Sequence, residues 1–177
     1  MKILDFAKAA LLLLCISFLV VWLNGEDWQP LGSDFRIVDG DTLRQGELRI
    51  RLAGIDAPET EQNCINAGKG VACGVLAKQH LSGLLAGQEI TCSNEGTDKH
   101  GRRLSVCKVQ GVSKTDNATL VTSGLQASIN AQMVHDGWAL AYGDYKALEI
   151  LAAIAQRGLW GLQFEEPEQW RRENGLN

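Results

Sequence analysis

The sequence predicts an α+β fold, in which a small Greek-key barrel of five short strands carries helices on its outside. Two observations predict this class. Several short runs alternate between apolar and polar residues and are separated by turn-forming residues, which is typical of strands. Longer runs place apolar residues at helical spacing and end at glycine, which is typical of amphipathic helices. In chain order the pattern is three strands, a helix, two strands and two helices.

The strands are predicted from the alternating runs and the turns between them. We expect them at residues 35–38, 42–44, 47–55, 89–93 and 103–109. In the third run Leu48, Ile50 and Leu52 share one face, whereas Arg49 and Arg51 lie on the other. The proline that follows this strand ends its ladder pairing, because proline has no amide hydrogen.

Helices are predicted at residues 74–86, 129–136 and 145–157, each followed by a glycine stop signal. In the last helix we expect four side chains to face inward: Ala147, Leu148, Leu151 and Ile154. Residues 110–127 are rich in glycine, serine and threonine and are expected to form a loop. The chain then divides into an N-terminal signal segment (1–24), a linker (25–33), the folded domain (34–163) and a charged, loosely held tail (164–177).

Net charge limits how this protein can bind nucleic acid. The 177 residues carry a formal net charge of −4. Such a balance counts against a protein that grips nucleic acid along a broad basic face. Any phosphate binding is therefore expected to be local, through a few well-placed arginines or a metal ion.

Residues 9–23 are uncharged and, apart from Ser17, apolar, and they follow Lys2 and Lys8. The run is shorter than the roughly 20 residues of an ordinary transmembrane helix and fits the apolar region of a signal peptide. Because no small-x-small cleavage site follows, we favour an uncleaved signal anchor with the domain outside the cytoplasm. Removal of the segment as a cleaved signal peptide is the alternative.

Four cysteines follow this segment: Cys64, Cys73, Cys92 and Cys107. An even number in an exported chain indicates disulfides, and four cysteines allow three pairings. We favour Cys64–Cys73, which closes a short glycine-containing loop, and Cys92–Cys107, which joins two strand-like runs. A zinc site is the weaker alternative, because the spacing is not that of paired CxxC motifs.

Three segments carry residue types suited to phosphate chemistry: 39–42, 51–59 and 98–102. Each has an ordinary explanation when taken alone, namely a hairpin turn, a surface cluster of ion pairs and a solvated turn. If Asp41 and Asp56 lie on neighbouring strands, their carboxylates with one backbone carbonyl and water make a weak site for a hard cation such as calcium. Arg51, Glu59 and Arg102 then supply phosphate-binding groups and a base.

Taken together and in this order, the segments resemble the staphylococcal nuclease family. The matching motifs are Val38-Asp39-Gly40-Asp41-Thr42, Arg51-Leu52 with Ile55-Asp56-Ala57-Pro58-Glu59, Asp98-Lys99-His100-Gly101-Arg102, Asn130-Ala131, Gly137-Trp138-Ala139 and Gly158-Leu159-Trp160. The likeness runs from about residue 35 to residue 160. It implies an OB-fold barrel with three helices and calcium-dependent cleavage of DNA and RNA to 3′-phosphate ends. The cysteine pairs resemble those of exported proteobacterial members.

The resemblance also implies a role for individual residues. Asp41, Asp56 and the backbone carbonyl of Ala57 fall on calcium ligands of the family, where the reference member has a threonine at the Ala57 position. Arg51 and Arg102 fall on its phosphate-binding arginines, and Glu59 on its candidate general base. Three features depart from the family pattern: His100 replaces a tyrosine of the nucleotide pocket, the 111–128 connection is longer, and the overall charge is acidic.

These observations predict a calcium-dependent nuclease with DNA and RNA as substrates. It is expected to be held at the inner membrane by its N-terminus, with the domain in the periplasm and no obligate protein partner. The first alternative is a non-catalytic OB-fold module that binds nucleic acid, which favours a basic, aromatic groove without the carboxylates. The second is a membrane-anchored structural domain that uses the barrel only as a scaffold.

Overall fold

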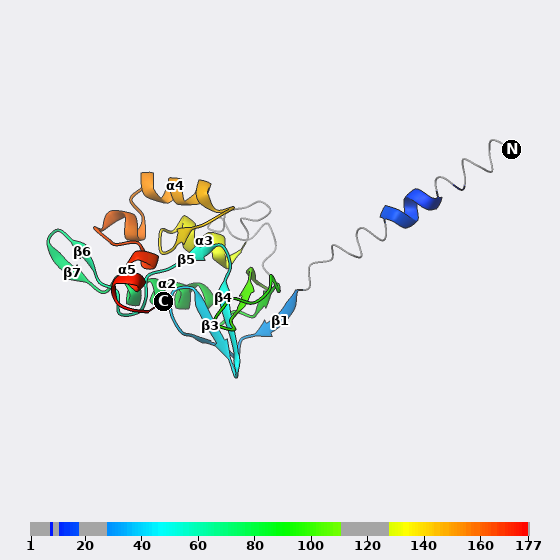
Figure 1. The fold of residues 1–177 in the computed structure, drawn as a ribbon, viewed down its shortest axis with the longest axis horizontal. Helices are drawn as coiled ribbons and strands as arrows, with labels where there is room; N and C mark the ends of the chain where they lie inside the picture. Colours follow the sequence, from blue (N-terminus) through cyan, green and yellow to red (C-terminus); the bar gives the residue numbers. More distant parts are fainter. Residues whose placement is uncertain (1–7, 9–10, 18–27, 111–127, 177) are drawn as a thin grey trace.

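The computed structural model describes residues 8, 11–17, 28–110 and 128–176, and has an α+β fold. Figure 1 shows the strands and the helices from α2 onward gathered in one body. Residues 11–17 are helical, and among the described residues no helix has both the length and the apolar character needed to cross a membrane. Most of the predicted signal segment, and residues 111–127 of the predicted loop, lie outside the described residues.

The strands are short, and most pair antiparallel. Their bounds are β1 (Gln29–Gly32), β2 (Arg36–Ile37), β3 (Thr42–Gln45), β4 (Leu48–Leu52), β5 (Ile55–Asp56), β6 (Cys64–Asn66), β7 (Lys69–Val71), β8 (Ile90–Cys92), β9 (Arg103–Ser105), β10 (Cys107–Val109) and β11 (Leu140–Ala141). One sheet has the order β2-β3-β4-β9 and another the order β1-β8-β10, while β5 pairs with β11 and β6 with β7. The β4–β9 pair is parallel.

The helices surround these sheets. They are α2 (Cys73–Leu85), α3 (Ile129–His135), α4 (Lys146–Ile154), the 3₁₀ helix η2 (Gly158–Gly161) and α5 (Pro167–Glu173). Helix α3 begins at Ser128, whose hydroxyl accepts a hydrogen bond from the amide of Ala131, 3.1 Å away. The three helices expected from sequence are therefore present, close to their predicted bounds.

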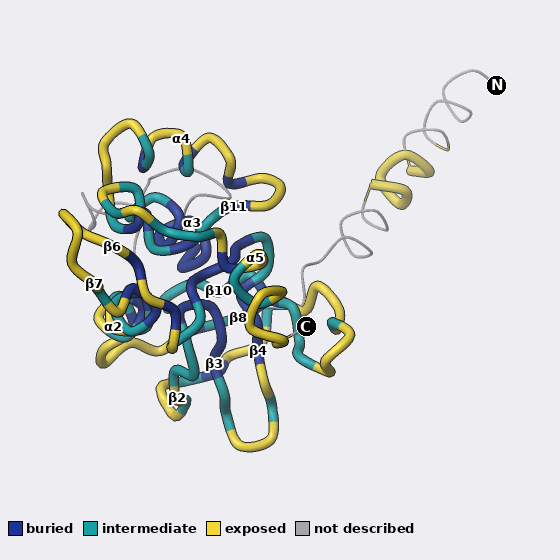
Figure 2. The backbone as a smooth tube through the Cα atoms, turned by 60° about the vertical axis from the view of Figure 1, so that its left-hand side comes forward, coloured by how far each residue is buried: buried dark blue, intermediate teal, exposed yellow. Residues whose placement is uncertain are grey.

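The core lies where β3, β4, β8 and α3 meet, as the buried segments of Figure 2 show. Ile50 and Leu52 are fully buried, as the alternation of the third run predicts. Arg51, on the opposite face of the same strand, is also buried, with only 9% of its surface exposed. A buried arginine requires ionic partners, and these are found at the candidate site.

Besides β11, two elements arise from segments where no strand was expected. Strand β1 lies in the predicted linker and pairs with β8, although it buries only Leu31. The hairpin of β6 and β7 forms within the loop between Cys64 and Cys73. Strand β1 depends on pairing with a distant strand, and the β6–β7 hairpin lies in a loop closed by the Cys64–Cys73 disulfide. Neither feature is contained in the alternation of apolar and polar residues along the segment itself.

The inward face predicted for α4 is wrong in part. Leu148 is buried as expected, but Ala147 is exposed, and Leu151 and Ile154 are 53% and 77% exposed. The second buried residue of this helix is Ala152, one turn after Leu148. The helix therefore rests on the body through a narrow stripe of two residues and presents larger apolar side chains outward.

The expectation of a loosely held tail is also wrong, because residues 167–173 form helix α5. Proline stands in the first turn, Glu168 lies near the N-terminus, and Arg171 and Arg172 lie in the last turn, an arrangement that complements the helix dipole. The carboxylate of Glu168 pairs with Arg172 at 2.8 Å, one turn away. In Figure 1 this helix lies beside β5.

The structure contains the two disulfides that the sequence analysis favours. Cys64–Cys73 links the start of β6 to the first residue of α2, and Cys92–Cys107 joins directly opposed residues of β8 and β10. Disulfides form and persist in oxidising environments, so the pair suggests a location outside the cytoplasm.

Candidate active site

The turn between β2 and β3 presents Asp41. The Asp39 carboxylate accepts a hydrogen bond from the Asp41 amide at 3.0 Å, which holds the turn. A Cβ at Gly40 would lie 2.7 Å from the Ala57 Cβ and 2.9 Å from the Ala77 Cβ, so the turn packs closely against its neighbours only with glycine at this position. Asp41 itself is 2% exposed. Burial, and then the charge of Asp41, raise the pKa of Asp39 to about 7.

Arg51 of β4 connects the two carboxylates predicted to meet. One terminal nitrogen lies 2.8 Å from Asp41 Oδ1 and the other 2.7 Å from Asp56 Oδ1. Asp41 and Asp56 therefore flank a single guanidinium. Burial lowers the pKa of Arg51, but the charges of Asp41 and Asp56 outweigh it and raise the pKa above its ordinary value.

The segment after β5 is fixed by its backbone. The amide of Ala57 donates to Asp41 Oδ2 at 3.0 Å, and the carbonyl of Glu59 accepts from the Gln62 amide at 2.8 Å. A Cβ at Gly74 would lie 1.7 Å from the Glu59 carbonyl oxygen, so the first turn of α2 approaches this loop as only glycine permits. Glu59 is thus held at the rim of the site by α2 and by fully buried Gln62.

A residue that the sequence analysis did not single out, Arg171 of α5, binds two of the predicted site residues. Its Nη1 lies 3.0 Å from Asp56 Oδ1 and 3.0 Å from Glu59 Oε1, and its Nη2 lies 2.9 Å from Asp56 Oδ2. Burial lowers the pKa of Arg171, but its hydrogen bonds and charge pairing with Asp56 and Glu59 raise it overall. The end of the chain therefore contributes to the site.

The turn before β9 holds the second predicted arginine. Asp98 Oδ1 accepts from the amides of His100 and Arg102, both at 2.9 Å, and its Oδ2 accepts from Arg102 Nε at 2.7 Å. Burial raises the pKa of Asp98, but these hydrogen bonds outweigh it and lower the pKa. Arg49 of β4 donates to the His100 carbonyl at 2.6 Å and ties the turn to the sheet.

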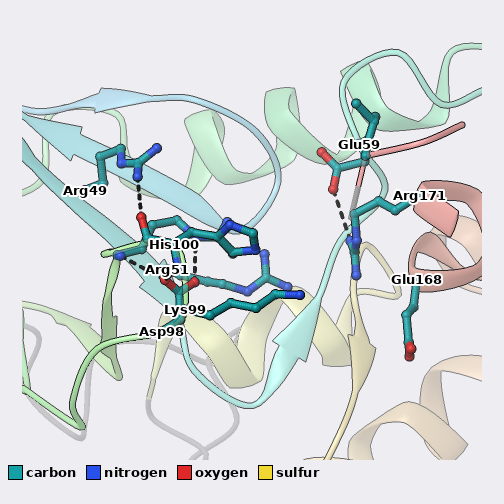
Figure 3. A pocket seen from close by; sticks show the side chains of 10 residues that line it. Arg49, Arg51, Glu59, Asp98, Lys99, His100, Glu168 and Arg171 are labelled. Atoms are coloured by element: carbon teal, nitrogen blue, oxygen red, sulfur yellow. Dashed lines mark hydrogen bonds and ion pairs between the residues drawn. The ribbon is translucent and has the colours of Figure 1, made fainter.

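These side chains surround one pocket with a volume of about 520 Å³. It is lined by Arg49, Arg51, Glu59, Asp98, Lys99, His100, Arg102, Glu168, Arg171 and Leu176. In Figure 3, Glu59 and Arg171 lie on one side, and Arg51, Lys99 and His100 lie on the other. Five of the lining residues are arginine or lysine and three are carboxylates, so the pocket is locally basic although the chain carries a net charge of −4.

Comparison with known proteins identifies the family. Residues 49–161 match the family model described as staphylococcal nuclease homologue. The chain belongs to the staphylococcal nuclease family. It is 34% identical to micrococcal nuclease of Shigella flexneri over 161 residues, covering 81% of this chain and 84% of that protein.

Two further relatives are similar over most of their length. Protein ParB of Escherichia coli is 32% identical over 180 residues, covering 93% of each chain. An uncharacterised endonuclease of Haemophilus influenzae is 30% identical over 154 residues, covering 80% of this chain and 73% of that protein. Membership in the staphylococcal nuclease family implies an OB fold and makes the chain a nuclease of that family.

The chemistry of the carboxylates in this nuclease-family chain suits a hard cation. Each carboxylate oxygen can accept about two hydrogen bonds, and Asp41 Oδ2 and Asp56 Oδ2 each accept one. Both therefore keep capacity for a further ligand, and oxygen donors are those that calcium prefers. Within residues 28–110 and 128–176, no three histidine, cysteine or acidic side chains form a group that could hold a metal ion. Any such site has to be completed by backbone oxygen, water or substrate.

The predicted site residues of this family member fall into three sets. Asp41, Arg51 and Asp56 are brought into direct contact, and Glu59 joins them through Arg171. Arg102 does not contact that cluster but lines the same pocket as Arg51 and Glu59. The amide of Ala57 contacts Asp41, while a role for its carbonyl stays a prediction. Arg171 was missed, although two arginines in the last turn of a short helix are visible in the sequence.

Proposed function

We propose that this protein is a calcium-dependent phosphodiesterase that hydrolyses DNA and RNA and leaves 3′-phosphate ends. One observation carries the proposal: Arg51, Arg102 and Glu59 line a single basic pocket, with Asp41 and Asp56 directly behind Arg51. A phosphodiester brings its own negative charge to such a pocket, so a local excess of arginine and lysine supports binding where the overall charge does not.

The two predicted arginines suit the charge that builds on phosphate oxygens during hydrolysis. Arg102 uses its Nε for Asp98, and its terminal nitrogens have no partner among the described residues, so they are available to a phosphate. Arg51 has one bond from each terminal nitrogen to a carboxylate and retains further N–H groups. Charge-assisted hydrogen bonds from both strengthen as negative charge develops.

Glu59 is the proposed general base. Its carboxylate lies on the pocket wall opposite Arg51, and it accepts one hydrogen bond from Arg171. A carboxylate placed there can take a proton from water that attacks the phosphorus. Asp41, Asp56 and the carbonyl of Ala57 would hold calcium, which supplies positive charge at a phosphate oxygen and lowers the pKa of bound water.

We further propose the finer architecture and location that the sequence predicts. The five-stranded OB barrel would be formed by strands of the two larger sheets, β2-β3-β4-β9 and β1-β8-β10, which together hold seven strands. The signal segment would anchor the chain in the inner membrane with the domain in the periplasm. The two disulfides support an oxidising compartment and do not discriminate between an anchored and a cleaved form.

The test is digestion of supercoiled plasmid by the full chain, purified in detergent, with calcium and with excess EDTA. We expect cutting that requires calcium and that falls at least about 100-fold in Glu59→Gln and Arg102→Gln. Arg44→Gln, an arginine of β3 outside the pocket, serves as the control and keeps wild-type activity. Retention of DNA without cutting, unaffected by EDTA, would instead indicate a non-catalytic binding module.

A further inference from the structure

Helix α5 supplies an arginine at the place where the proposed nuclease needs a phosphate. Arg171 is the fifth residue of this seven-residue helix, and its side chain is 20% exposed, toward the pocket that it lines. It reaches residues that are 115 and 112 positions earlier in the chain, Asp56 and Glu59. The position of its guanidinium is therefore fixed by the tertiary fold.

The hydrogen bonds of Arg171 occupy one edge of the guanidinium and leave another edge free. Nη1 and Nη2 each donate to one oxygen of Asp56, which makes a two-bond fork, and the second N–H of Nη1 donates to Glu59. A guanidinium carries five N–H donors in one plane. The two N–H groups that remain, one on Nε and one on Nη2, lie on the same edge of the guanidinium. Neither has a hydrogen-bond partner among the residues that the structure describes.

Two parallel N–H groups on one edge are the arrangement that binds a phosphate through a pair of hydrogen bonds. Asp56 and Glu59 hold the group in place, so little side-chain entropy is lost when a ligand binds the free edge. We propose that Arg171 is a third phosphate-binding arginine of the active site, acting from the wall opposite Arg51 through its Nε–Nη2 edge. The proposal rests on the nuclease function proposed above, because it assigns a contact to the same substrate.

The placement of the other cations supports this role. Arg51, Arg102 and Lys99 come from the β-sheet and the turn before β9, whereas Arg171 comes from α5. Figure 3 places Arg171 beside Glu59 and across the pocket from Arg51 and Lys99. Arg51 and Arg171 both donate to Asp56 Oδ1, so a nucleotide phosphate beside that carboxylate can be contacted by both arginines. The chain end beyond residue 163 then becomes part of the substrate site.

The competing explanation is that Arg171 only neutralises Asp56 and Glu59. Both explanations predict some loss of activity when Arg171 is changed, so the decisive measurement is DNA binding without catalysis. Each phosphate contact made by a cation contributes about 0.7 to the slope of log affinity against log salt for a single strand. An arginine that only neutralises Asp56 and Glu59 makes no phosphate contact and therefore makes no contribution to that slope.

The experiment measures fluorescence anisotropy of a labelled single-stranded DNA with the full chain in EDTA, over a range of salt concentrations. Variants are Arg171→Gln and Arg171→Lys, with Arg172→Gln as the matched control, because Arg172 lies next along the same helix but outside the pocket. Circular dichroism and urea unfolding check that each variant folds.

We expect Arg171→Gln to weaken binding about tenfold or more, as for loss of a hydrogen bond to a charged group, and to reduce the salt slope by about 0.7. Arg171→Lys keeps the charge and restores the slope, but regains only part of the affinity because it lacks the fork. Arg172→Gln stays within twofold of wild type. In calcium, the same Arg171→Gln change raises KM for cleavage.

The proposal is overturned if folded Arg171→Gln has the affinity and salt slope of Arg172→Gln, even when its cleavage is slow, because Arg171 is then only a positioning residue. It is also overturned if the wild-type chain does not bind DNA at all. If the wild type binds DNA and Arg171→Gln binds less, but no calcium-dependent cutting occurs, the phosphate contact stands while the proposed nuclease function fails. The two proposals are therefore separable.

Discussion

Arg51 illustrates how a single side chain joins the fold to the site. Its neighbours on the strand, Ile50 and Leu52, are fully buried in the core, while its guanidinium lies between Asp41 and Asp56 on the pocket side. A planar group with donors in a fixed fork can bond two carboxylates at once and keep further N–H groups for a ligand. Lysine presents its donors from one nitrogen on a flexible stem, so it cannot reproduce the fork in which two separate nitrogens each reach one carboxylate.

Arg51→Lys is therefore expected to lower kcat/KM for DNA cleavage by at least about 100-fold. The free energy of unfolding should also fall, by roughly 1–3 kcal/mol, because one buried carboxylate loses its hydrogen bond. Steady-state cleavage in calcium and urea unfolding measure the two effects. Arg44→Lys, on the adjacent strand, should change neither. Wild-type kcat/KM in Arg51→Lys would exclude the proposed role of this arginine.

How much of the site was predictable depends on separation along the chain. Asp41, Arg51, Asp56 and Glu59 lie within one turn, one strand and one strand end, so a local motif contains them all. Arg171 is 112 residues from Glu59, and nothing in its own helix indicates which carboxylates it reaches. A contact of this kind is set by how α5 packs on the body, which sequence pattern alone does not describe.

Separation along the chain also distinguishes the helices and strands that were predicted from those that were not. Strands β3 and β4 and helix α2 have strong periodicity and clear stop signals, and they occur where expected. Strand β1 has only one buried residue, Leu31, and exists through pairing with the distant strand β8. The face of α4 was wrong in part because periodicity identifies an apolar stripe but does not say how much of it the body covers.

A cluster of polar side chains around a single carboxylate, Asp136, joins helices α2 and α3 and allows a test of pH dependence. Asp136, directly after α3, pairs with His80 of α2 at 2.8 Å and with His135 at 2.9 Å, and Gln132 donates to both of its oxygens at 2.9 Å. Burial raises the pKa of Asp136, but the hydrogen bonds, led by that of His80, outweigh it and lower the pKa to about 2. A lowered pKa means that the ionised form stabilises the folded state.

The contribution of Asp136 is present above the ordinary aspartate pKa near 4 and is lost as pH falls through about 2. We expect Asp136→Asn to lower the free energy of unfolding at pH 7 by about 1–2 kcal/mol, which discounts the full shift for partial exposure. At pH 3 the difference from wild type should shrink to about half. Urea unfolding at both pH values measures it, and a difference that does not change with pH would contradict the assignment.

At the scale of the whole molecule, charge is separated in space. The chain as a whole is acidic, yet five of its 17 arginines and lysines line one pocket that has only three carboxylates. The net charge of −4 predicts local phosphate binding, but composition alone gives no position for the basic residues. Their gathering depends on β4, the turn before β9 and α5 meeting at one place.

The Cys64–Cys73 disulfide holds the part of the molecule that brings these walls together. Gln62, two residues before Cys64, accepts from the Gly74 amide at 3.2 Å and donates to the Glu165 carbonyl at 2.7 Å. Ile65, one residue after Cys64, exchanges two backbone hydrogen bonds of 2.8 Å with Gln163. The crosslinked segment thus connects the loop of Glu59 to the chain leading into α5.

Removing the two disulfides separately should therefore have unequal effects on activity. Each double variant, Cys64→Ala with Cys73→Ala or Cys92→Ala with Cys107→Ala, is expected to lose about 2–4 kcal/mol of stability, because each crosslink restricts the unfolded chain. Only the Cys64→Ala, Cys73→Ala variant is expected to loosen Glu59 and Arg171 relative to each other. Small displacements of groups in an active site lower the reaction rate. We expect the kcat/KM of this variant to fall about tenfold or more, against less than about threefold for the second, when both are assayed well below their unfolding temperatures. Equal losses of kcat/KM would mean that the first disulfide stabilises the fold without positioning the site.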